Sequence, residues 1–191
     1  MIVYLHGFRS SPASRKATML RQAMASRDRS AEYLCPALPA SPARAVKEVE
    51  SLVQGLAPER LALIGSSLGG YYATWLAERL GCRVVLLNPA IRPQDDLANH
   101  LGEQPVFFSD ASIDFRREYL GELDSIDTPT ITRPERYLLI AAMGDTVIDY
   151  RAMMRKYSGA RQIIIEGSDH ELSDFADHLE DVLAFCDQGG Q

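Results

Sequence analysis

Ser67 stands at the centre of a Gly-x-Ser-x-Gly motif, Gly65 to Gly69, which joins an apolar run to a helical pattern. A strand, a sharp turn and a helix form the context in which this motif places a nucleophilic serine at the tip of the turn. Such a turn crowds the backbone, and glycines relieve the crowding because they lack a Cβ atom. The motif therefore predicts a nucleophile elbow with Ser67 as the reactive hydroxyl, while Ser66 points back into the fold.

The same motif has three other interpretations, of which two are excluded. A phosphate-binding loop needs a Gly-Lys-Ser/Thr ending, and a dinucleotide-binding loop needs glycine where Ser67 stands. Neither requirement is met. The remaining alternative is a glycine-rich turn without a catalytic role in an ordinary α/β protein.

A serine hydroxyl is a poor nucleophile until a base takes its proton, and a carboxylate orients that base. His170 ends a Gly-Ser-Asp-His loop directly after a predicted strand, at the same sheet edge as Ser67. His178 falls at a surface position of the last predicted helix, and His100 falls in an irregular segment. His6 follows the first strand and suits a structural hydrogen-bonding role beneath a turn. We therefore predict His170 as the general base.

The carboxylate should follow a strand between the serine and the histidine, in the order Ser, Asp, His. Asp145 forms a Gly-Asp pair immediately after the predicted strand 137–142. Asp149 competes for the role, but its position favours an N-cap for the next helix. Asp169 adjoins the base and should point elsewhere. Asp145 is therefore the predicted third member of a catalytic triad.

An oxyanion hole needs two backbone N–H groups aimed at the charge that develops on the substrate carbonyl oxygen. The residue after the nucleophile, Leu68, supplies the first at the N-terminus of its helix. The loop after an earlier strand should supply the second. His6-Gly7-Phe8 is that loop, so we predict the Phe8 amide as the other donor.

Alternating strands and helices must position these residues. Strands are predicted at 2–5, 33–35, 61–64, 83–87, 137–142 and 162–165, and helices at about 14–26, 41–55, 68–80, 149–157 and 171–186. Such alternation indicates a mostly parallel sheet with helices on both faces. The fold class expected is α/β, with six strands in one domain over residues 1–191.

Residues 90–133 interrupt this alternation without clean periodicity. They follow the carboxyl end of a strand, where open α/β sheets place their ligand crevice, and we expect a small cap over the active site. A surface excursion is the alternative. Phe107, Phe108 and Tyr119 in this segment are candidate substrate-binding residues, although aromatic side chains in a small domain more often pack the core.

The composition and net charge limit the classes of partner that the chain is expected to bind. The chain of 191 residues is 46% hydrophobic and carries a net charge of −6, which argues against nucleic acid or an anionic membrane as partner. There is no signal-peptide pattern and no apolar run of membrane-spanning length, and the three cysteines are far apart, so a cytoplasmic location is expected. Histidines and cysteines never fall at ligand spacing, so we expect no metal and no other cofactor. No pattern in the sequence indicates an oligomeric state.

Together, several blocks of the chain resemble the YqiA/YcfP-type bacterial esterases, the UPF0227 group of the α/β-hydrolase superfamily. The blocks are His6-Gly7-Phe8, Ser10-Ser11-Pro12 with Lys16, Gly65 to Gly70, Asn88-Pro89-Ala90, Gly144-Asp145 and Gly167 to His170. The resemblance runs from Met1 to about Phe185. It implies a compact α/β-hydrolase fold without the first two strands of the larger family, and a serine esterase with Ser67, Asp145 and His170 as its triad.

The predicted function is hydrolysis of a small-molecule carboxylic ester or acyl thioester through an acyl-enzyme. Thioesterases, lactonases and carbon–carbon bond hydrolases use the same triad, because the fold does not determine the substrate. The alternative from another class is a non-catalytic binding or interaction module on a hydrolase fold. The complete Ser, Asp, His order counts against that alternative.

Overall fold

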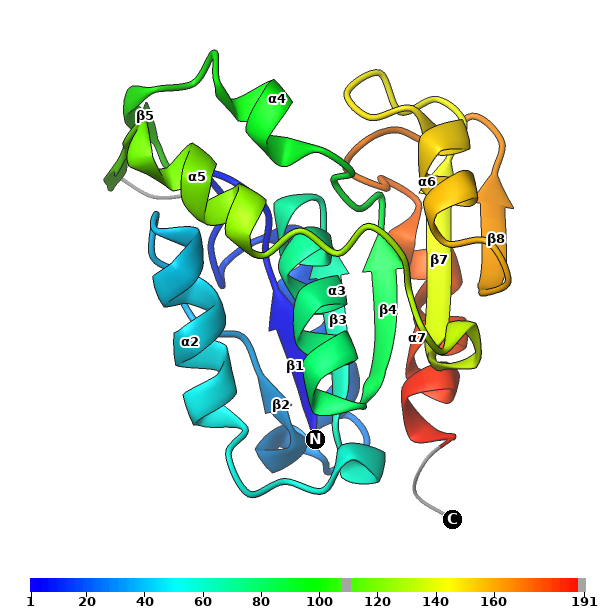
Figure 1. The fold of residues 1–191 in the computed structure, drawn as a ribbon. Helices are drawn as coiled ribbons and strands as arrows, with labels where there is room; N and C mark the ends of the chain where they lie inside the picture. The colour runs from blue at the N-terminus through cyan, green and yellow to red at the C-terminus, as the bar shows by residue number, and fades with distance from the viewer. Residues whose placement is uncertain (108–110, 189–191) are drawn as a thin grey trace.

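Six parallel strands form the central sheet of this computed structural model, which describes residues 1–107 and 111–188 (Figure 1). They are β1 (Ile2–Leu5), β2 (Tyr33–Leu34), β3 (Ala62–Ser66), β4 (Arg83–Leu87), β7 (Tyr137–Ala142) and β8 (Arg161–Ile165). Their order is β2-β1-β3-β4-β7-β8, and each neighbouring pair is parallel. The prediction of a mostly parallel six-stranded sheet is confirmed.

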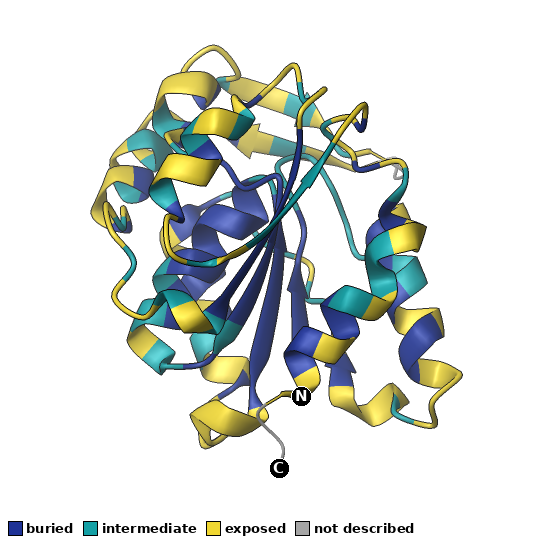
Figure 2. Cartoon of the chain, turned by 90° about the vertical axis from the view of Figure 1, so that its right-hand side faces the viewer, coloured by how far each residue is buried: buried dark blue, intermediate teal, exposed yellow. Residues whose placement is uncertain are grey.

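Helices cover both faces of this sheet. One face carries α1 (Arg15–Ala25) and α7 (Phe175–Asp187), while α2 (Pro42–Leu52), α3 (Leu68–Leu80) and α6 (Tyr150–Lys156) cover the other. Each face has its own hydrophobic core, because successive strand residues point to opposite sides. In β1, for example, Val3 and Leu5 join one core, and Ile2 and Tyr4 join the other. Figure 2 shows the buried strands between helices whose outer faces are exposed.

Local sequence signals set the ends of two of these helices. Ser41 caps α2, since its Oγ accepts a hydrogen bond from the Arg44 backbone N–H at 3.2 Å, and proline occupies the first helical position. Gly81 ends α3 in the left-handed region, with φ 76°. The start of α2 and the end of α3 therefore agree with the sequence prediction.

The segment between β4 and β7 is more regular than its sequence suggests. It contains α4 (Pro93–Leu97), the antiparallel pair β5 (Gly102–Pro105) and β6 (Ser112–Phe115), and α5 (Glu118–Ser125). These elements are four to eight residues long. A helix or strand this short has too few residues to show a clear hydrophobic periodicity in the sequence.

Other differences are smaller. The last helix begins at Phe175 rather than near Glu171, because residues 171–174 form a loop in which Leu172 has φ 49°. Three short 3₁₀ turns precede strands: η1 (Ser30–Glu32), η2 (Pro58–Arg60) and η3 (Pro134–Arg136). Among the helices of residues 1–107 and 111–188, none is long and apolar enough to cross a membrane.

Candidate active site

The turn between β3 and α3 holds Ser67 in a strained conformation, with φ 53° and ψ −119°. Two glycines make the turn possible. A Cβ atom on Gly65 would collide with the Gly69 carbonyl, and one on Gly69 would collide with the Leu5 carbonyl oxygen. Strain of this kind persists only where the surroundings enforce it, and it concentrates at functional sites. The strand, sharp turn and helix expected of a nucleophile elbow are all present.

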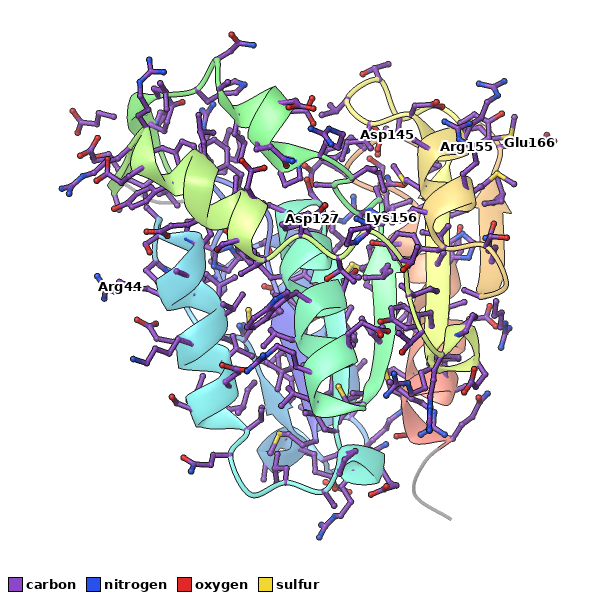
Figure 3. The ribbon with its side chains drawn as sticks, viewed as in Figure 1. Arg44, Asp127, Asp145, Arg155, Lys156 and Glu166 are labelled. Atoms are coloured by element: carbon purple, nitrogen blue, oxygen red, sulfur yellow. The ribbon has the colours of Figure 1, made fainter. Side chains whose placement is uncertain are left out.

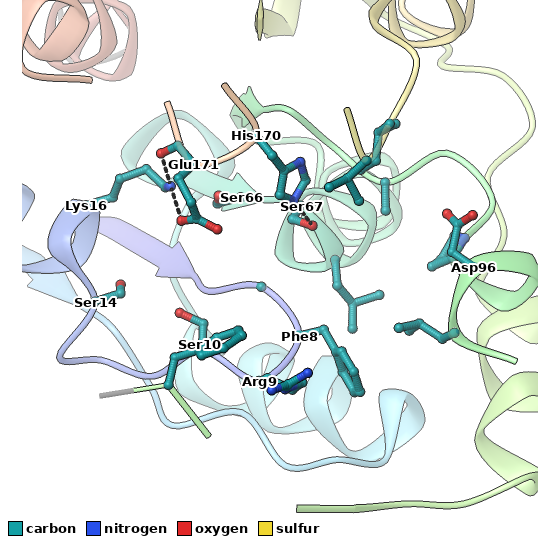
Figure 4. A pocket seen from close by; sticks show the side chains of 18 of the residues that line it. Phe8, Arg9, Ser10, Ser14, Lys16, Ser66, Ser67, Asp96, His170 and Glu171 are labelled. Atoms are coloured by element: carbon teal, nitrogen blue, oxygen red, sulfur yellow. Dashed lines mark hydrogen bonds and ion pairs between the residues drawn. The ribbon is translucent and has the colours of Figure 1, made fainter. Parts of the chain in front are cut away.

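The structure brings Ser67, His170 and Asp145 into one hydrogen-bonded line. His170 Nε2 lies 3.1 Å from Ser67 Oγ, and His170 Nδ1 lies 2.7 Å from Asp145 Oδ2. With Nδ1 protonated, the imidazole donates to the carboxylate and its Nε2 accepts from the serine hydroxyl. The three residues are supplied by the loops after β3, β7 and β8 at the carboxyl edge of the sheet (Figures 3 and 4).

Asp145 is held firmly in this arrangement. Its side chain is completely buried. While Oδ2 faces the histidine, Oδ1 accepts hydrogen bonds from the backbone N–H groups of Val147 and Ile148, at 2.8 and 2.9 Å. Hydrogen bonds to the charged form stabilise a buried carboxylate. The loop therefore presents one defined oxygen to the imidazole.

The competing acids have other partners. Asp149 caps α6 by accepting from the Arg151 N–H at 3.0 Å. Asp169 accepts from the hydroxyl and the N–H of Ser173, and these hydrogen bonds lower the pKa of its carboxyl. Neither carboxylate bonds to His170, as the sequence analysis expected.

The remaining histidines lie outside the triad. His6 is buried; its Nδ1 donates to the Gly7 carbonyl and its Nε2 accepts from the Leu38 N–H at 3.1 Å. Burial lowers the pKa of His6, which favours the neutral ring in this structural role. His178 is on α7, whereas His100 lines the active-site cavity with its ring 6.0 Å from Phe8.

The two predicted oxyanion donors lie beside the serine. Leu68 is the first residue of α3, and both Phe8 and Leu68 line the same cavity as Ser67. In the described part of the chain, neither backbone N–H has a hydrogen-bond acceptor. The loop of Phe8 packs closely on the elbow, because a Cβ atom on Gly7 would come within 3.3 Å of Ser67 Cβ. Both amides are therefore free to bind an oxyanion.

A cavity of about 560 Å³ opens over Ser67 and His170 (Figure 4). Its two halves differ in chemistry. The more apolar half is lined by Phe8, Leu68, Ala90, Pro93, Leu97, Val147 and Ile148, and it also contains Asp96 of α4 and His100, whose ring lies against Phe8. The polar half is lined by Tyr4, Ser10, Ser14, Arg15, Lys16, Ser66 and Glu171. Burial raises the pKa of the Tyr4 phenol far above its usual range, so this hydroxyl stays neutral.

The three candidate substrate-binding aromatics have different positions. Phe107 lines the cavity, with the Arg9 guanidinium 4.5 Å from its ring centre. Tyr119 is not among the lining residues; it packs on the buried Phe115, with ring centres 5.6 Å apart. Phe108 lies outside the described residues. Of the two described candidates, Phe107 therefore has the position that a substrate contact requires and Tyr119 does not.

Sequence reasoning missed two buried residues that hold the histidine loop. Asn88, fully buried, donates from Nδ2 to the carbonyls of Asp169 and His170 and accepts from the Ala142 N–H through Oδ1. Lys16 is 6% exposed and donates from Nζ to the next carbonyl, that of Glu171, at 2.5 Å. Three consecutive carbonyl oxygens of this loop are thus fixed by side-chain donors. The Asn-Pro pair at the end of β4 was the available signal for Asn88.

Within residues 1–107 and 111–188, no group of three or more His, Cys, Asp or Glu side chains is arranged to hold a metal ion. The groups at the centre of the cavity are a serine hydroxyl, an imidazole and a carboxylate in one hydrogen-bonded line.

Comparison with known proteins agrees with this fold. A family model described as "Uncharacterised protein family (UPF0227)" matches residues 1–187. UPF0227 protein YcfP of Salmonella gallinarum is 26% identical over 192 residues, covering 97% of this chain and 98% of that protein. Mouse alpha/beta hydrolase domain-containing protein 10 superposes with a TM-score of 0.69 at 15% identity, over 96% of this chain and 89% of that one. A monoacylglycerol lipase from Paleococcus ferrophilus has the same TM-score and identity, over 99% and 94%.

Proposed function

This chain belongs to the UPF0227 family, as the sequence resemblance indicated, and we propose that it is a serine hydrolase of carboxylic esters or acyl thioesters. The observation that supports the proposal is the line Asp145–His170–Ser67, which ends in a cavity beside two free amides. The two solved structures compared above are 15% identical to this chain, and a likeness at that level supports the α/β-hydrolase fold alone. The chemistry is therefore argued from the geometry of this chain.

The proposed reaction begins when His170 Nε2 takes the proton of Ser67 as Oγ attacks the substrate carbonyl. The attack forms a carbon–oxygen bond and moves the carbonyl electron pair onto oxygen, where the N–H groups of Phe8 and Leu68 bind it. The Asp145 carboxylate stabilises the imidazolium. Collapse of this intermediate expels the alcohol or thiol, which His170 protonates, and leaves an acyl ester on Ser67.

Deacylation repeats these steps with water. His170 removes a proton from water, the resulting hydroxide attacks the acyl carbonyl, and Ser67 leaves with the proton that His170 returns. The strained backbone of Ser67 keeps Oγ at the tip of the turn throughout, so both steps share one oxyanion hole. Each donor of such a hole typically contributes about 10²–10³ in rate.

We further propose that residues 90–133 act as a small cap that shapes the acyl side of the cavity. In support, α4 contributes Pro93 and Leu97 to the lining, and Phe107 follows β5. Pro93 and Leu97 belong to the apolar half of the cavity, and Phe107 adjoins it. An apolar acyl chain would bury its surface there and leave the polar half to another part of the substrate.

The test compares wild type with Ser67→Ala on a panel of acyl esters and thioesters of graded chain length. Wild type should turn over members of the panel, and Ser67→Ala should lose turnover with an unchanged circular-dichroism spectrum. A serine-reactive phosphonate should also label wild type at Ser67 only. A protein that binds the esters without turnover and without labelling would be the binding module instead, and the proposal would be wrong.

A further inference from the structure

The polar half of the cavity contains a buried lysine that touches none of the proposed reacting groups. Lys16 is 6% exposed and lines the cavity, and its side chain reaches from α1 to Glu171 (Figure 4). A buried lysine is uncommon because desolvation penalises its charge. One of its hydrogen bonds, to the Glu171 carbonyl, fixes the ammonium in place.

The first turn of α1 adds further positive potential to the same place. This helix of eleven residues has no acidic residue in its first turn and no side-chain cap. Within the described residues, the N–H groups of Arg15 and Lys16 have no acceptor. Unpaired N–H groups at a helix N-terminus favour an anion.

Ser14 provides an independent indication that a ligand belongs here. The residue is 7% exposed and lines the cavity, yet its Oγ has no hydrogen-bond partner in the part of the chain that the structure describes. Buried hydroxyls are normally satisfied, and one left without a partner costs free energy. Ser14 therefore faces the Tyr4 phenol without a hydrogen bond of normal geometry, and its hydroxyl can serve a ligand in the half of the cavity that holds Lys16.

The side chain of Glu171 indicates which anion fits. Its Oε2 lies 3.2 Å from Lys16 Nζ, but the side chain is 79% exposed and can rotate into solvent. An exposed carboxylate is a weakly held partner. Lys16 thus keeps its bond to the backbone of the loop and has an exchangeable carboxylate position that opens into the cavity.

We propose that Lys16, Ser14 and the first turn of α1 form a subsite for a carboxylate carried by the substrate, so that the preferred esters bear a second, free carboxylate. The substrate carboxylate replaces that of Glu171 while the reacting carbonyl lies at Ser67. This inference rests on the proposed hydrolase function and adds a substrate class to it.

The experiment measures kcat/KM for matched pairs of esters that differ by one charge. One pair carries the charge on the acyl side: mono-p-nitrophenyl adipate and its methyl ester. The other carries it on the leaving group: 4-acetoxybenzoate and methyl 4-acetoxybenzoate. Wild type should prefer the charged member of one pair, and the pair that responds shows on which side of the scissile bond the carboxylate lies. Equal or lower kcat/KM for the charged member of both pairs would overturn the inference.

Two variants should shift this preference in opposite directions. Lys16→Met should lower the charged-to-neutral ratio of kcat/KM by about tenfold or more, the size of one charge-assisted hydrogen bond. Glu171→Gln removes the competing carboxylate and should raise the ratio, mainly through a lower KM for the charged ester. Lys47→Met is the matched control, since Lys47 is an exposed lysine on α2 away from the cavity, and its ratio should equal that of wild type.

The charged-to-neutral ratio of kcat/KM separates the binding of a substrate carboxylate by Lys16 from the role of Lys16 in positioning the histidine loop. If Lys16 only positions the histidine loop, Lys16→Met lowers kcat for charged and neutral esters alike, the ratio stays constant, and the inference is wrong. If Lys16→Met does not fold, Glu171→Gln still tests the subsite from the solvent side. If no ester of either pair is cleaved by wild type, the failure belongs to the proposed function.

Discussion

Asn88 Nδ2 donates a hydrogen bond of 3.1 Å to the carbonyl oxygen of His170, a residue 82 positions away in the chain. Its Oδ1 accepts from the N–H of Ala142, the last residue of the strand that precedes Asp145. One buried amide therefore fixes the loops of His170 and Asp145 relative to each other. A catalytic group gains rate when its geometry is set before the substrate arrives.

Replacing Asn88 by alanine should lower kcat for a neutral ester with little change in KM, because the loop of His170 loses two anchors while the cavity keeps its lining. The unsatisfied groups left behind should also lower the free energy of unfolding by about 1–3 kcal/mol. Steady-state kinetics and urea unfolding measure both. Thr74→Val is the control, since Thr74 is buried and hydrogen-bonded on α3 but does not touch this loop. An Asn88→Ala enzyme with wild-type kcat would show that the anchors serve stability alone.

Asp145→Asn should lower kcat by about 10⁴ while the protein stays folded. Oδ1 accepts two backbone N–H groups, so the amide oxygen of asparagine must take that place and its NH₂ must face His170. The NH₂ group then forces the imidazole into the tautomer that cannot accept the proton of Ser67. Asp149→Asn is the matched control, because asparagine caps a helix as well as aspartate does. Its kcat should be that of wild type, and comparable losses in the two variants would contradict the assignment.

Gly69→Ala should prevent the elbow from forming, since the new Cβ atom would collide with the Leu5 carbonyl. The collision is with backbone, so no side-chain movement relieves it. We expect little folded protein and no phosphonate labelling at Ser67. Gly121→Ala serves as the control, because Gly121 is exposed on α5 with nothing within 4 Å of the new atom. That variant should gain about 0.5–1 kcal/mol of stability from reduced chain entropy and better helix propensity.

His6 should make the fold less stable in mild acid. Burial lowers the pKa of His6 in the folded state, whereas the unfolded chain titrates near 6.5. Between the two values the unfolded state binds more protons, so the contribution of His6 is present above pH 6.5 and is lost as the pH falls towards the folded pKa. Urea unfolding of wild type and His6→Gln at several pH values from 7 to 5 measures the effect. The wild-type curve should be the steeper of the two, and parallel curves would exclude this role.

The nucleophile, acid and base could be predicted from the sequence as candidates because each depends on local chemistry. Gly65 and Gly69 are dictated by a single turn, and Asp145 and His170 each follow a strand whose apolar run is easy to recognise. The structure places their side chains together, which the position of each residue after the carboxyl end of a strand had suggested. The fold class and the six strands were predictable for the same reason: buried parallel strands are continuous apolar runs.

The other features of the site and the fold depend on tertiary contacts, so the sequence contains weaker signals for them. Asn88 matters because β4 lies beside β7, and no local pattern states which carbonyls its amide will meet. Tyr119 and Phe107 have similar side chains within one segment, but only the fold decides that the first packs on Phe115 and the second faces the cavity. The start of the last helix at Phe175 depends on the loop that presents His170.

Strand β8 lies at the edge of the sheet, and its residues are exposed or half-buried, whereas β3 is buried throughout. His170 follows β8 and Ser67 follows β3, so the proposed base and the proposed nucleophile belong to regions of unequal local stability. Edge elements open more readily than the centre of a sheet. Partial opening of β8 would part His170 from Ser67 while the central strands remain folded. Enzyme activity should then disappear at lower denaturant concentration than the global fold, and hydrogen exchange should be faster in β8 than in β3.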